Sequence, residues 1–225
     1  MSSHLRSLLV FGASCPTGQQ IVAEALRTGW KVTIYGRRTL PIHAQNAGLH
    51  LQRDQTLEGT LQDEAQLRRA IQGQTVIVSV LGPSGMTIKD TPFPDFYRRI
   101  FRLMREAHVS RILALSIFSV PHPRDRYSLP CSLLVGMLRV LGHSAWRNFI
   151  EVARAFDEDA EDLEWKLFRV GFLKDQGPGW VVEGYVGDGA LGLGVNRCDV
   201  ARWVVEQAAL DQAEHVRDKP GISSA

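Results

Sequence analysis

The sequence predicts an α/β fold, in which a doubly wound, mainly parallel sheet has helices on both faces. Short apolar runs at residues 8–11, 31–35 and 75–81 are typical of strands buried on both sides. Helical patterns of about ten residues alternate with these runs, which favours parallel strands joined by helices. The chain has 225 residues, 44% of them hydrophobic, so one core is sufficient and residues 1–225 are expected to form a single domain.

The first half of the chain contains three expected strands. A turn with Gly12 and Gly18 follows the first strand, and the helix after it ends near Gly29. The second strand, at 31–35, is rich in β-branched residues. Residues 39–56 are predicted as a helix with irregular flanks, and Leu57 and Glu58 as part of a short third strand. Residues 63–72 are expected to form a helix with an acidic first turn, and residues 75–81 a buried strand.

The second half is predicted to continue this alternation. The expected helices cover residues 95–107, 132–160 with a break near Gly142, and 198–209, and the expected strands cover 111–115 and 165–170. The apolar stretch at 129–142 is predicted to be a buried helix under a loop, with a pocket wall or an interface as the alternatives. Residues 121–130 are expected to form a loop, and the glycine-rich segment 171–194 loops and short strands. The last residues are predicted to be a polar tail.

Charge and cysteine content argue against several classes of protein. The net charge is only +2, which does not favour a nucleic-acid-binding surface. The three cysteines have no zinc-ligand spacing, so we expect no metal and a reduced, cytoplasmic setting. The N-terminus lacks the apolar core of a signal peptide, and 129–142 is too short to span a bilayer. The expected partner is a small-molecule substrate, with no nucleic acid and no membrane, for a monomer or homodimer.

The turn after the first strand has the pattern of a dinucleotide site. Glycines allow a tight turn and close approach of a phosphate, and Gly12 and Gly18 have the separation of the outer pair of a GxxGxxG turn. The helix N-terminus that follows favours a bound pyrophosphate. Cys15 stands where the middle glycine is usual, so a structural turn that has lost its cofactor remains an alternative. The turn predicts a Rossmann-type fold whose cofactor-binding residues include Gly12, Ser14, Cys15, Pro16, Thr17 and Gly18.

The end of the second strand favours NADP(H) as the cofactor. An acidic residue at this place binds the ribose hydroxyls of NAD, whereas arginine binds the extra phosphate of NADP. The chain reads Tyr35-Gly36-Arg37-Arg38, with no acidic residue. The planar guanidinium groups of Arg37 and Arg38 suit a phosphate. The alternative is that both arginines are only solvated surface charge.

Several segments together resemble a known family. The run VFGASCPTGQQIVAEAL, followed by GWKVTIYGRR, resembles the atypical short-chain dehydrogenases of the NmrA-like and flavin/biliverdin reductase type. Segments 78–82, 107–116, 163–173 and 196–204 resemble later motifs of that family in the same order. The resemblance implies an NADP(H)-dependent oxidoreductase with a Rossmann-type domain. It also implies that Leu61, Val80, Leu81 and Gly82 lie at the cofactor.

The chain departs from this family at some positions. Cys15 replaces the middle glycine, Thr60 stands where an aspartate near the adenine is common, and Val170 replaces a proline. The proton-donating Tyr-x-x-x-Lys pair is missing, because Tyr127 is followed four residues later by Cys131. In the flavin-reductase-like branch that absence is normal, since the cofactor delivers hydride and the protein supplies orientation.

Catalytic candidates follow from the expected position of the ligand at the carboxyl ends of the strands. Segments 83–95, 117–147 and 171–195 are predicted to be inserted there and to cover the substrate. Ser116 is expected to donate a hydrogen bond to substrate or nicotinamide, or alternatively to backbone. His122 is a candidate general acid, or only an exposed loop histidine. Tyr127 is a candidate proton donor, although its ordinary pKa near 10 would make it slow.

These observations leave two functions open. The first is an NADP(H)-dependent reductase that transfers hydride to a small conjugated or aromatic carbonyl or quinone, with residues 129–141 covering the substrate. The second is a redox-silent member of the same fold, either a cofactor-sensing regulator or a cyclase or isomerase. Cys15 and the missing tyrosine–lysine pair favour the second function. The missing pair does not decide between the two functions, because proteins of either kind can lack it.

Overall fold

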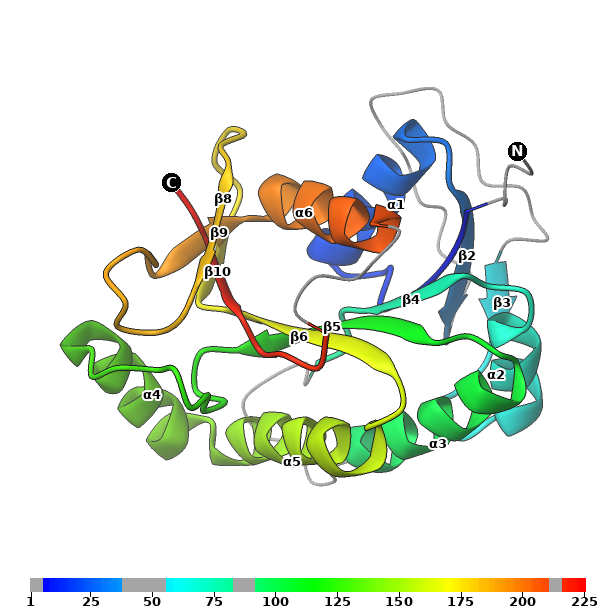
Figure 1. Ribbon diagram of the computed structural model, residues 1–225, viewed down its shortest axis with the longest axis horizontal. Helices are drawn as coiled ribbons and strands as arrows, with labels where there is room; N and C mark the ends of the chain where they lie inside the picture. Colours follow the sequence, from blue (N-terminus) through cyan, green and yellow to red (C-terminus); the bar gives the residue numbers. More distant parts are fainter. Residues whose placement is uncertain (1–5, 38–55, 83–91, 211–215) are drawn as a thin grey trace.

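The computed structural model describes residues 6–37, 56–82, 92–210 and 216–225, and it contains a mainly parallel sheet between two layers of helices (Figure 1). Eight strands are ordered β3-β2-β1-β4-β5-β6-β10-β8, and only β10 and β8 pair antiparallel. The predicted fold class is therefore confirmed. The strands of this sheet, in its spatial order, are Thr56–Glu58, Lys31–Gly36, Ser7–Phe11, Val76–Ser79, Arg111–Ile117, Glu164–Val170, Gly221–Ser224 and Val181–Gly184.

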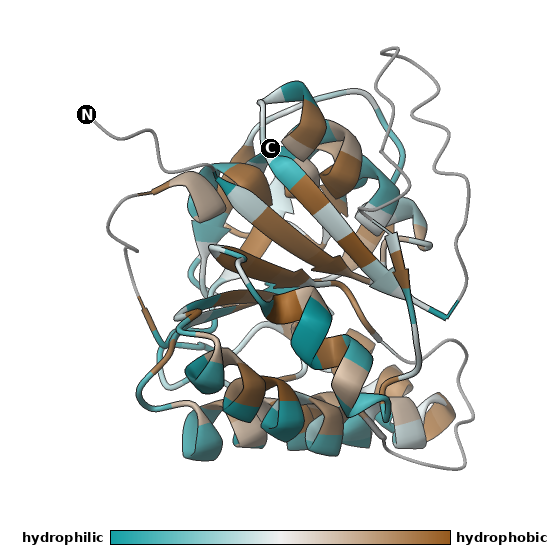
Figure 2. Cartoon of the chain, turned by 90° about the vertical axis from the view of Figure 1, so that its right-hand side faces the viewer, coloured by the Kyte–Doolittle hydropathy of each residue, from teal (hydrophilic) through white to brown (hydrophobic). Residues whose placement is uncertain are grey.

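Helices cover both faces of the sheet. Helices α1 (Pro16–Arg27) and α6 (Arg197–Ala209) pack against one face, together with one cluster of buried apolar side chains. Helices α2 (Glu64–Ile71), α3 (Pro92–Glu106) and α5 (His143–Asp159) pack against the other. Figure 2 shows the apolar sheet between these two layers and polar residues on the outer surface of the helices. Because the strands from β3 to β6 in this sheet are parallel, their carboxyl ends lie at the same edge of the sheet.

Aromatic packing holds α3 and α5 together against the sheet. Phe96 of α3 meets Phe11 of β1 edge to face, with 5.3 Å between ring centroids. Phe101 meets Phe156 of α5 at 4.8 Å in the same manner. Such pairs add to the stabilisation that comes from burying their area, because ring edges and faces have opposite partial charge. This packing fixes α3 against β1 and against the C-terminal half of α5.

Helix α4 (Leu129–Leu141) corrects one prediction, because it is not buried. Of its residues only Cys131 is buried, in a small cluster with Phe118 and Val186. The helix continues the layer of α5 at its outer end (Figure 1), so most of its apolar surface has no sheet against it. The sequence pattern alone misled here because apolar residues surround the whole helix. Its large exposed apolar side chains are Leu129, Leu133, Met137, Val140 and Leu141.

The C-terminus corrects a second prediction. The expected polar tail contains β10, which pairs in parallel with β6 and antiparallel with β8. Ile222 is fully buried and its neighbours Gly221 and Ser223 are buried too, so this strand belongs to the core. In the glycine-rich segment, β7 (Phe172–Lys174) pairs with β9 (Gly194–Asn196), which confirms the expected short strands.

Most other expected elements agree with the structure to within a few residues. The break near Gly142 separates α4 from α5, and the short third strand is β3. The helix predicted for residues 39–56 lies almost entirely outside the described residues, as does most of the expected covering segment 83–95. Within the described ranges, no helix combines the length and apolarity needed to cross a membrane.

Candidate functional site

The turn between β1 and α1 is built on glycine backbone geometry. Gly12 has a φ of +83°, a conformation that residues with a Cβ rarely adopt. A Cβ there would also lie 3.0 Å from the backbone carbonyl carbon and oxygen of Val80. The turn is therefore pressed against the chain that leaves β4, and the two predicted cofactor segments lie side by side.

Gly18 and Cys15 define the start of α1. A Cβ on Gly18 would collide with the carbonyl oxygen of Gly12, so this position accepts no side chain without a shift of the backbone. Cys15 is the N-cap, with an extended backbone, and its Sγ accepts a hydrogen bond from the Gly18 N–H at 3.3 Å. Because its φ is −82°, nothing in the backbone at Cys15 requires glycine.

The remaining residues of the turn have different surroundings. Ser14 and Pro16 are exposed, whereas Thr17 is buried. The first N–H groups of a helix have no acceptor within the helix, and the Cys15 sulfur satisfies one of them. The sulfur faces the helix end and the apolar cluster beneath it. The close backbone approach at Gly12 and Gly18, with a helix N-terminus next to it, fits a nucleotide pyrophosphate.

Arg37 lies beside this turn. Strands β1 and β2 are parallel, with Phe11 opposite Tyr35, so Gly12 and Gly36 leave the sheet next to each other. Arg37 follows directly and is exposed. Arg37 therefore leaves the sheet at the same edge as the glycine turn, and its contact with a phosphate remains a prediction. Arg38, the second predicted phosphate contact, lies outside the described residues.

Leu61, which is predicted to lie at the cofactor, belongs to the loop between β3 and α2. It is half-buried against the core, and its carbonyl oxygen accepts a hydrogen bond from Arg99 at 2.7 Å. The preceding Thr60 carbonyl accepts one from the Tyr35 hydroxyl at 2.8 Å, and Gly59 has no room for a side chain beside that hydroxyl. Burial raises the pKa of Tyr35 to about 12, so the hydroxyl remains a donor that ties this loop to β2.

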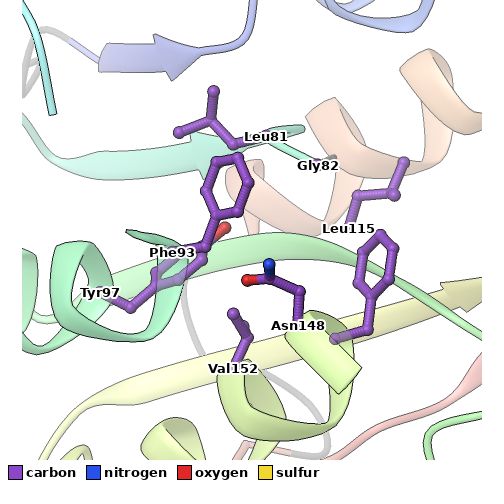
Figure 3. Close-up of a pocket in the computed structure, with 8 residues that line it drawn as sticks. Leu81, Gly82, Phe93, Tyr97, Leu115, Asn148 and Val152 are labelled. Carbon is purple, nitrogen blue, oxygen red and sulfur yellow. The ribbon is translucent and has the colours of Figure 1, made fainter. Parts of the chain in front are cut away.

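The chain after β4 continues into a small pocket at the carboxyl ends of β4 and β5. Val80 N donates to the Phe11 carbonyl at 3.0 Å, which extends the sheet by one residue before Leu81 and Gly82. The pocket is small, with room for about one water molecule (Figure 3). Its lining residues come from the end of β4, from β5, from α3 and from α5; they are Leu81, Gly82, Phe93, Tyr97, Leu115, Asn148, Phe149 and Val152.

The polar groups near this pocket are deeply buried. The Tyr97 hydroxyl is 2.7 Å from the Ser79 Oγ, and burial raises the pKa of Tyr97 to about 12. Asn148 is 1% exposed, yet neither its amide nitrogen nor its amide oxygen has a hydrogen-bond partner. Figure 3 shows the Asn148 amide directed into the space between Phe93 and Leu115. The pocket thus contains one neutral group that can both donate and accept.

Ser116 is the predicted catalytic residue that lies nearest to this region. It follows Leu115 on β5, it is 1% exposed, and its Oγ has no hydrogen-bond partner. The alternative of a hydroxyl bonded to backbone therefore does not describe this structure. Ser116 is not among the pocket's lining residues, so the structure brings it close along the strand without exposing it.

His122 belongs to a different group of side chains. Its Nε2 lies 2.9 Å from Asp218, its Nδ1 accepts the Arg124 N–H at 3.1 Å, and its ring stacks on Tyr185 at 4.6 Å. Burial lowers the pKa of His122, and the nearby Arg169 guanidinium adds to this, while Asp218 and Asp125 oppose it. A ring nitrogen that accepts a hydrogen bond must be unprotonated, so we infer a neutral ring that donates to Asp218. Both ring nitrogens of this predicted general acid are thus engaged.

Tyr127 is not brought together with Ser116. Its side chain is 80% exposed, in the loop before α4. None of the three predicted catalytic residues lines the pocket, and their roles remain predictions. Sequence reasoning missed Asn148, Tyr97 and Phe149. The spacing of Asn148, Val152 and Phe156 was the available signal, since it places the amide on the helix face that carries the core residues.

Comparisons with solved structures support the architecture. A short-chain dehydrogenase/reductase from Veillonella parvula in complex with NADP has 16% identity and a TM-score of 0.74, over 97% of this chain and 94% of that one. ChuY, an anaerobillin reductase from Escherichia coli O157:H7, has 17% identity and a TM-score of 0.69, over 97% of each chain. The oxidoreductase ylbE from Lactococcus lactis has 15% identity and a TM-score of 0.70, over 97% and 91%.

The family is shown by sequence as well. No curated protein matches the chain. A model of the NAD(P)H-binding family matches residues 12–211, which begin at the first glycine of the turn and end after α6. The match covers the glycine turn, Arg37 and the pocket between α3 and α5, and it confirms the resemblance to short-chain dehydrogenases at the level of family and fold. The chain belongs to the NAD(P)H-binding family of Rossmann-type proteins.

Proposed function

We propose that the protein is an NADP(H)-dependent oxidoreductase that reduces a small conjugated or aromatic carbonyl or quinone by hydride transfer. The observation that supports this most strongly is the edge shared by the Gly12–Gly18 turn and Arg37. The turn offers backbone N–H groups to a pyrophosphate, and Arg37 offers a guanidinium for the additional phosphate of NADP(H). No carboxylate follows β2 within Gly36, Arg37 and Arg38 to bind an NAD ribose instead.

The cofactor-binding residues would be Gly12, Ser14, Cys15, Pro16, Thr17 and Gly18 at the pyrophosphate, with Arg37 and Arg38 at the 2′-phosphate. When bound, the cofactor supplies the hydride. Leu61 would border the adenine, and Val80, Leu81 and Gly82 the nicotinamide end. A Cβ on Gly82 would lie 3.3 Å from the Phe149 ring, so glycine at this position keeps the space beside that ring open.

The remaining residues orient the substrate. Leu81, Leu115 and Phe149 form apolar walls beside the carboxyl ends of β4 and β5. The Ser116 Oγ is buried without a partner, so it is available to donate a hydrogen bond to a developing oxyanion after a small movement. Tyr97 is held by Ser79, and its raised pKa makes it a poor acid at neutral pH. We therefore propose that the substrate oxygen takes its proton from solvent.

One observation favours the redox-silent alternative. The Cys15 sulfur uses the Gly18 N–H, which is one of the donors that a pyrophosphate would otherwise receive. A cofactor-sensing regulator, or a cyclase or isomerase, would tolerate weaker cofactor binding. Such a protein would show activity or partner binding that does not consume NADPH.

The test is consumption of NADPH with a panel of small quinones and aromatic aldehydes. We expect the wild-type protein to oxidise NADPH with at least one of them. Gly18→Ala should abolish this, because the new methyl group collides with the Gly12 carbonyl oxygen. Gly136→Ala is the matched control, since a Cβ there meets no atom within 4 Å. Absence of NADPH binding by the folded wild-type protein would refute the proposal.

A further inference from the structure

Helix α4 carries a row of apolar side chains that the rest of the described structure leaves exposed. The helix lies at the outer end of the α5 layer (Figure 1), and Cys131 is its one buried residue. Large exposed apolar patches on soluble domains mark sites of interaction, because water contact with such a patch is unfavourable. We call this row the apolar stripe; each of its members is more than half exposed, and they are Leu129, Leu133, Met137, Val140 and Leu141.

The charges around the apolar stripe are all positive. Residues 126–150 contain three arginines and no acidic residue, although the whole chain has nearly as many acidic residues as basic ones, 24 against 26. The three arginines are Arg126 before α4, Arg139 on it and Arg147 on the first turns of α5, and all three are exposed. The Arg139 guanidinium lies 4.8 Å from the centre of the Trp146 ring.

The acidic residues that border this segment do not offset the three arginines. Asp125, on the N-terminal side, is paired with the buried Arg169 at 2.7 Å. Glu151, on the C-terminal side, is paired with Arg154 at 3.0 Å. The α4 region therefore combines an apolar surface with a net positive charge.

This combination disfavours a second copy of the chain as the partner. In a two-fold symmetric dimer the same patch lies on both sides of the interface. Pairing through α4 would bring the arginines of both copies together without an acidic residue from residues 126–150 to separate them. An anionic lipid surface has the complementary chemistry, because its acyl chains accept apolar side chains and its headgroups carry negative charge.

We propose that α4 binds the surface of an anionic lipid bilayer and lies in the plane of the headgroups. The apolar stripe would enter the acyl-chain boundary, and the three arginines would contact lipid phosphates. Thirteen residues of helix are about 20 Å long, too short for a hydrocarbon core of about 30 Å, so the contact is peripheral. The proposal departs from the expectation of no membrane partner, which followed from the lack of a spanning segment.

The test is flotation of the full chain with two kinds of vesicle, one of phosphatidylcholine alone and one of phosphatidylcholine and phosphatidylserine in equal parts. We expect at least about tenfold stronger binding to the mixed vesicles, since each arginine near an anionic surface contributes about fivefold. The double variant Leu133→Ser, Val140→Ser should weaken this binding by at least about tenfold. Both side chains are 67% or more exposed, so the fold should persist, which circular dichroism checks.

A second double variant separates the charge from the apolar contact. Arg139→Gln with Arg147→Gln should weaken binding to the mixed vesicles by at least about tenfold and leave binding to phosphatidylcholine unchanged. The controls are Val216→Ser, at an exposed apolar side chain before β10, and Arg27→Gln, on α1 at the opposite face of the sheet. Neither control should change binding by more than about twofold.

Four results would overturn the inference. The folded wild type could fail to bind the mixed vesicles, or it could bind them unchanged by the serine variant. Equal binding to both kinds of vesicle would refute the role of the arginines. A wild-type dimer that the serine variant makes monomeric, in a protein that binds no vesicle, would assign α4 to a second copy. The measurement requires neither cofactor nor substrate, so this proposal does not rest on the reductase function.

Discussion

Arg169 on β6 is fully buried, and its guanidinium donates to both carboxylate oxygens of Asp125, at 2.7 and 2.8 Å. Asp125 belongs to the loop after β5, and it also accepts the backbone N–H groups of His122 and Val186. This one carboxylate therefore fixes the loop to the sheet and to the segment after β8. The charge of Arg169 is compensated within the fold, so the pair is structural.

Replacement of Asp125 should be far more costly than replacement of an exposed partner. Asp125→Ala leaves a buried guanidinium unpaired, and we expect the free energy of unfolding to fall by about 3 kcal/mol or more. Asp175→Ala is the control, because Asp175 pairs with Arg197 at 2.6 Å with 74% of its own side chain exposed. Its loss should cost less than about 1 kcal/mol. Urea denaturation measures both values, and similar losses in the two variants would contradict the structural role of the pair.

Stability should depend on His122 below neutral pH. Burial lowers the pKa of His122 in the folded state below its ordinary 6.5, whereas the unfolded chain keeps the ordinary value. The unfolded state then binds more protons as the pH falls, so the contribution of His122 is complete above pH 6.5 and is lost toward the lowered pKa. The neighbouring charges are Asp218, Asp125, Arg169 and Lys219.

The measurement is the free energy of unfolding of wild type and His122→Gln between neutral and mildly acid pH. We expect the wild type to lose more stability than the variant across this window. A wild-type curve that instead rises on acidification relative to the variant would show that His122 is charged and paired with Asp218.

The unpartnered amide of Asn148 should lower the stability of the folded protein. Asn148→Leu removes a buried amide that has no partner, so the free energy of unfolding should rise by about 1–3 kcal/mol. Thermal unfolding measures this effect. A variant less stable than wild type would mean that the amide is already satisfied in the native protein.

The sequence predicted the strands and the cofactor turn because both depend on local pattern. The run at β1 is buried throughout, and the two glycines of the turn are required by close backbone approach. The exposure of α4 and the strand β10 were not predictable, because they depend on what lies beside them. The sequence of an apolar helix does not show whether another element covers it. Ile222 becomes a core residue only because β10 pairs with β6 and β8.

The candidate site was predicted in part. Its cofactor half follows from the order of strand, turn and helix, so Gly12, Gly18 and Arg37 were recognisable. Its substrate half is assembled from α3 (Pro92–Glu106) and α5 (His143–Asp159). In the sequence, 36 residues separate the end of α3 from the start of α5. Contacts across such a distance leave no local pattern. The helical spacing of Asn148, Val152 and Phe156 indicated that the Asn148 amide faces the core, but not that α3 and the end of β4 lie against it. No sequence pattern indicated that both ring nitrogens of His122 are engaged.

The most direct test of the account is a titration of the wild-type protein and Arg37→Ala with NADPH and NADH. We predict that the wild type binds NADPH at least about tenfold more tightly than NADH, since a guanidinium–phosphate contact contributes about 1.5–3 kcal/mol. The ratio should approach one in Arg37→Ala and remain unchanged in Arg154→Ala, which removes an exposed arginine on α5. Equal affinity for the two cofactors in the wild type would contradict the role of Arg37, and no binding of either would contradict the nucleotide site.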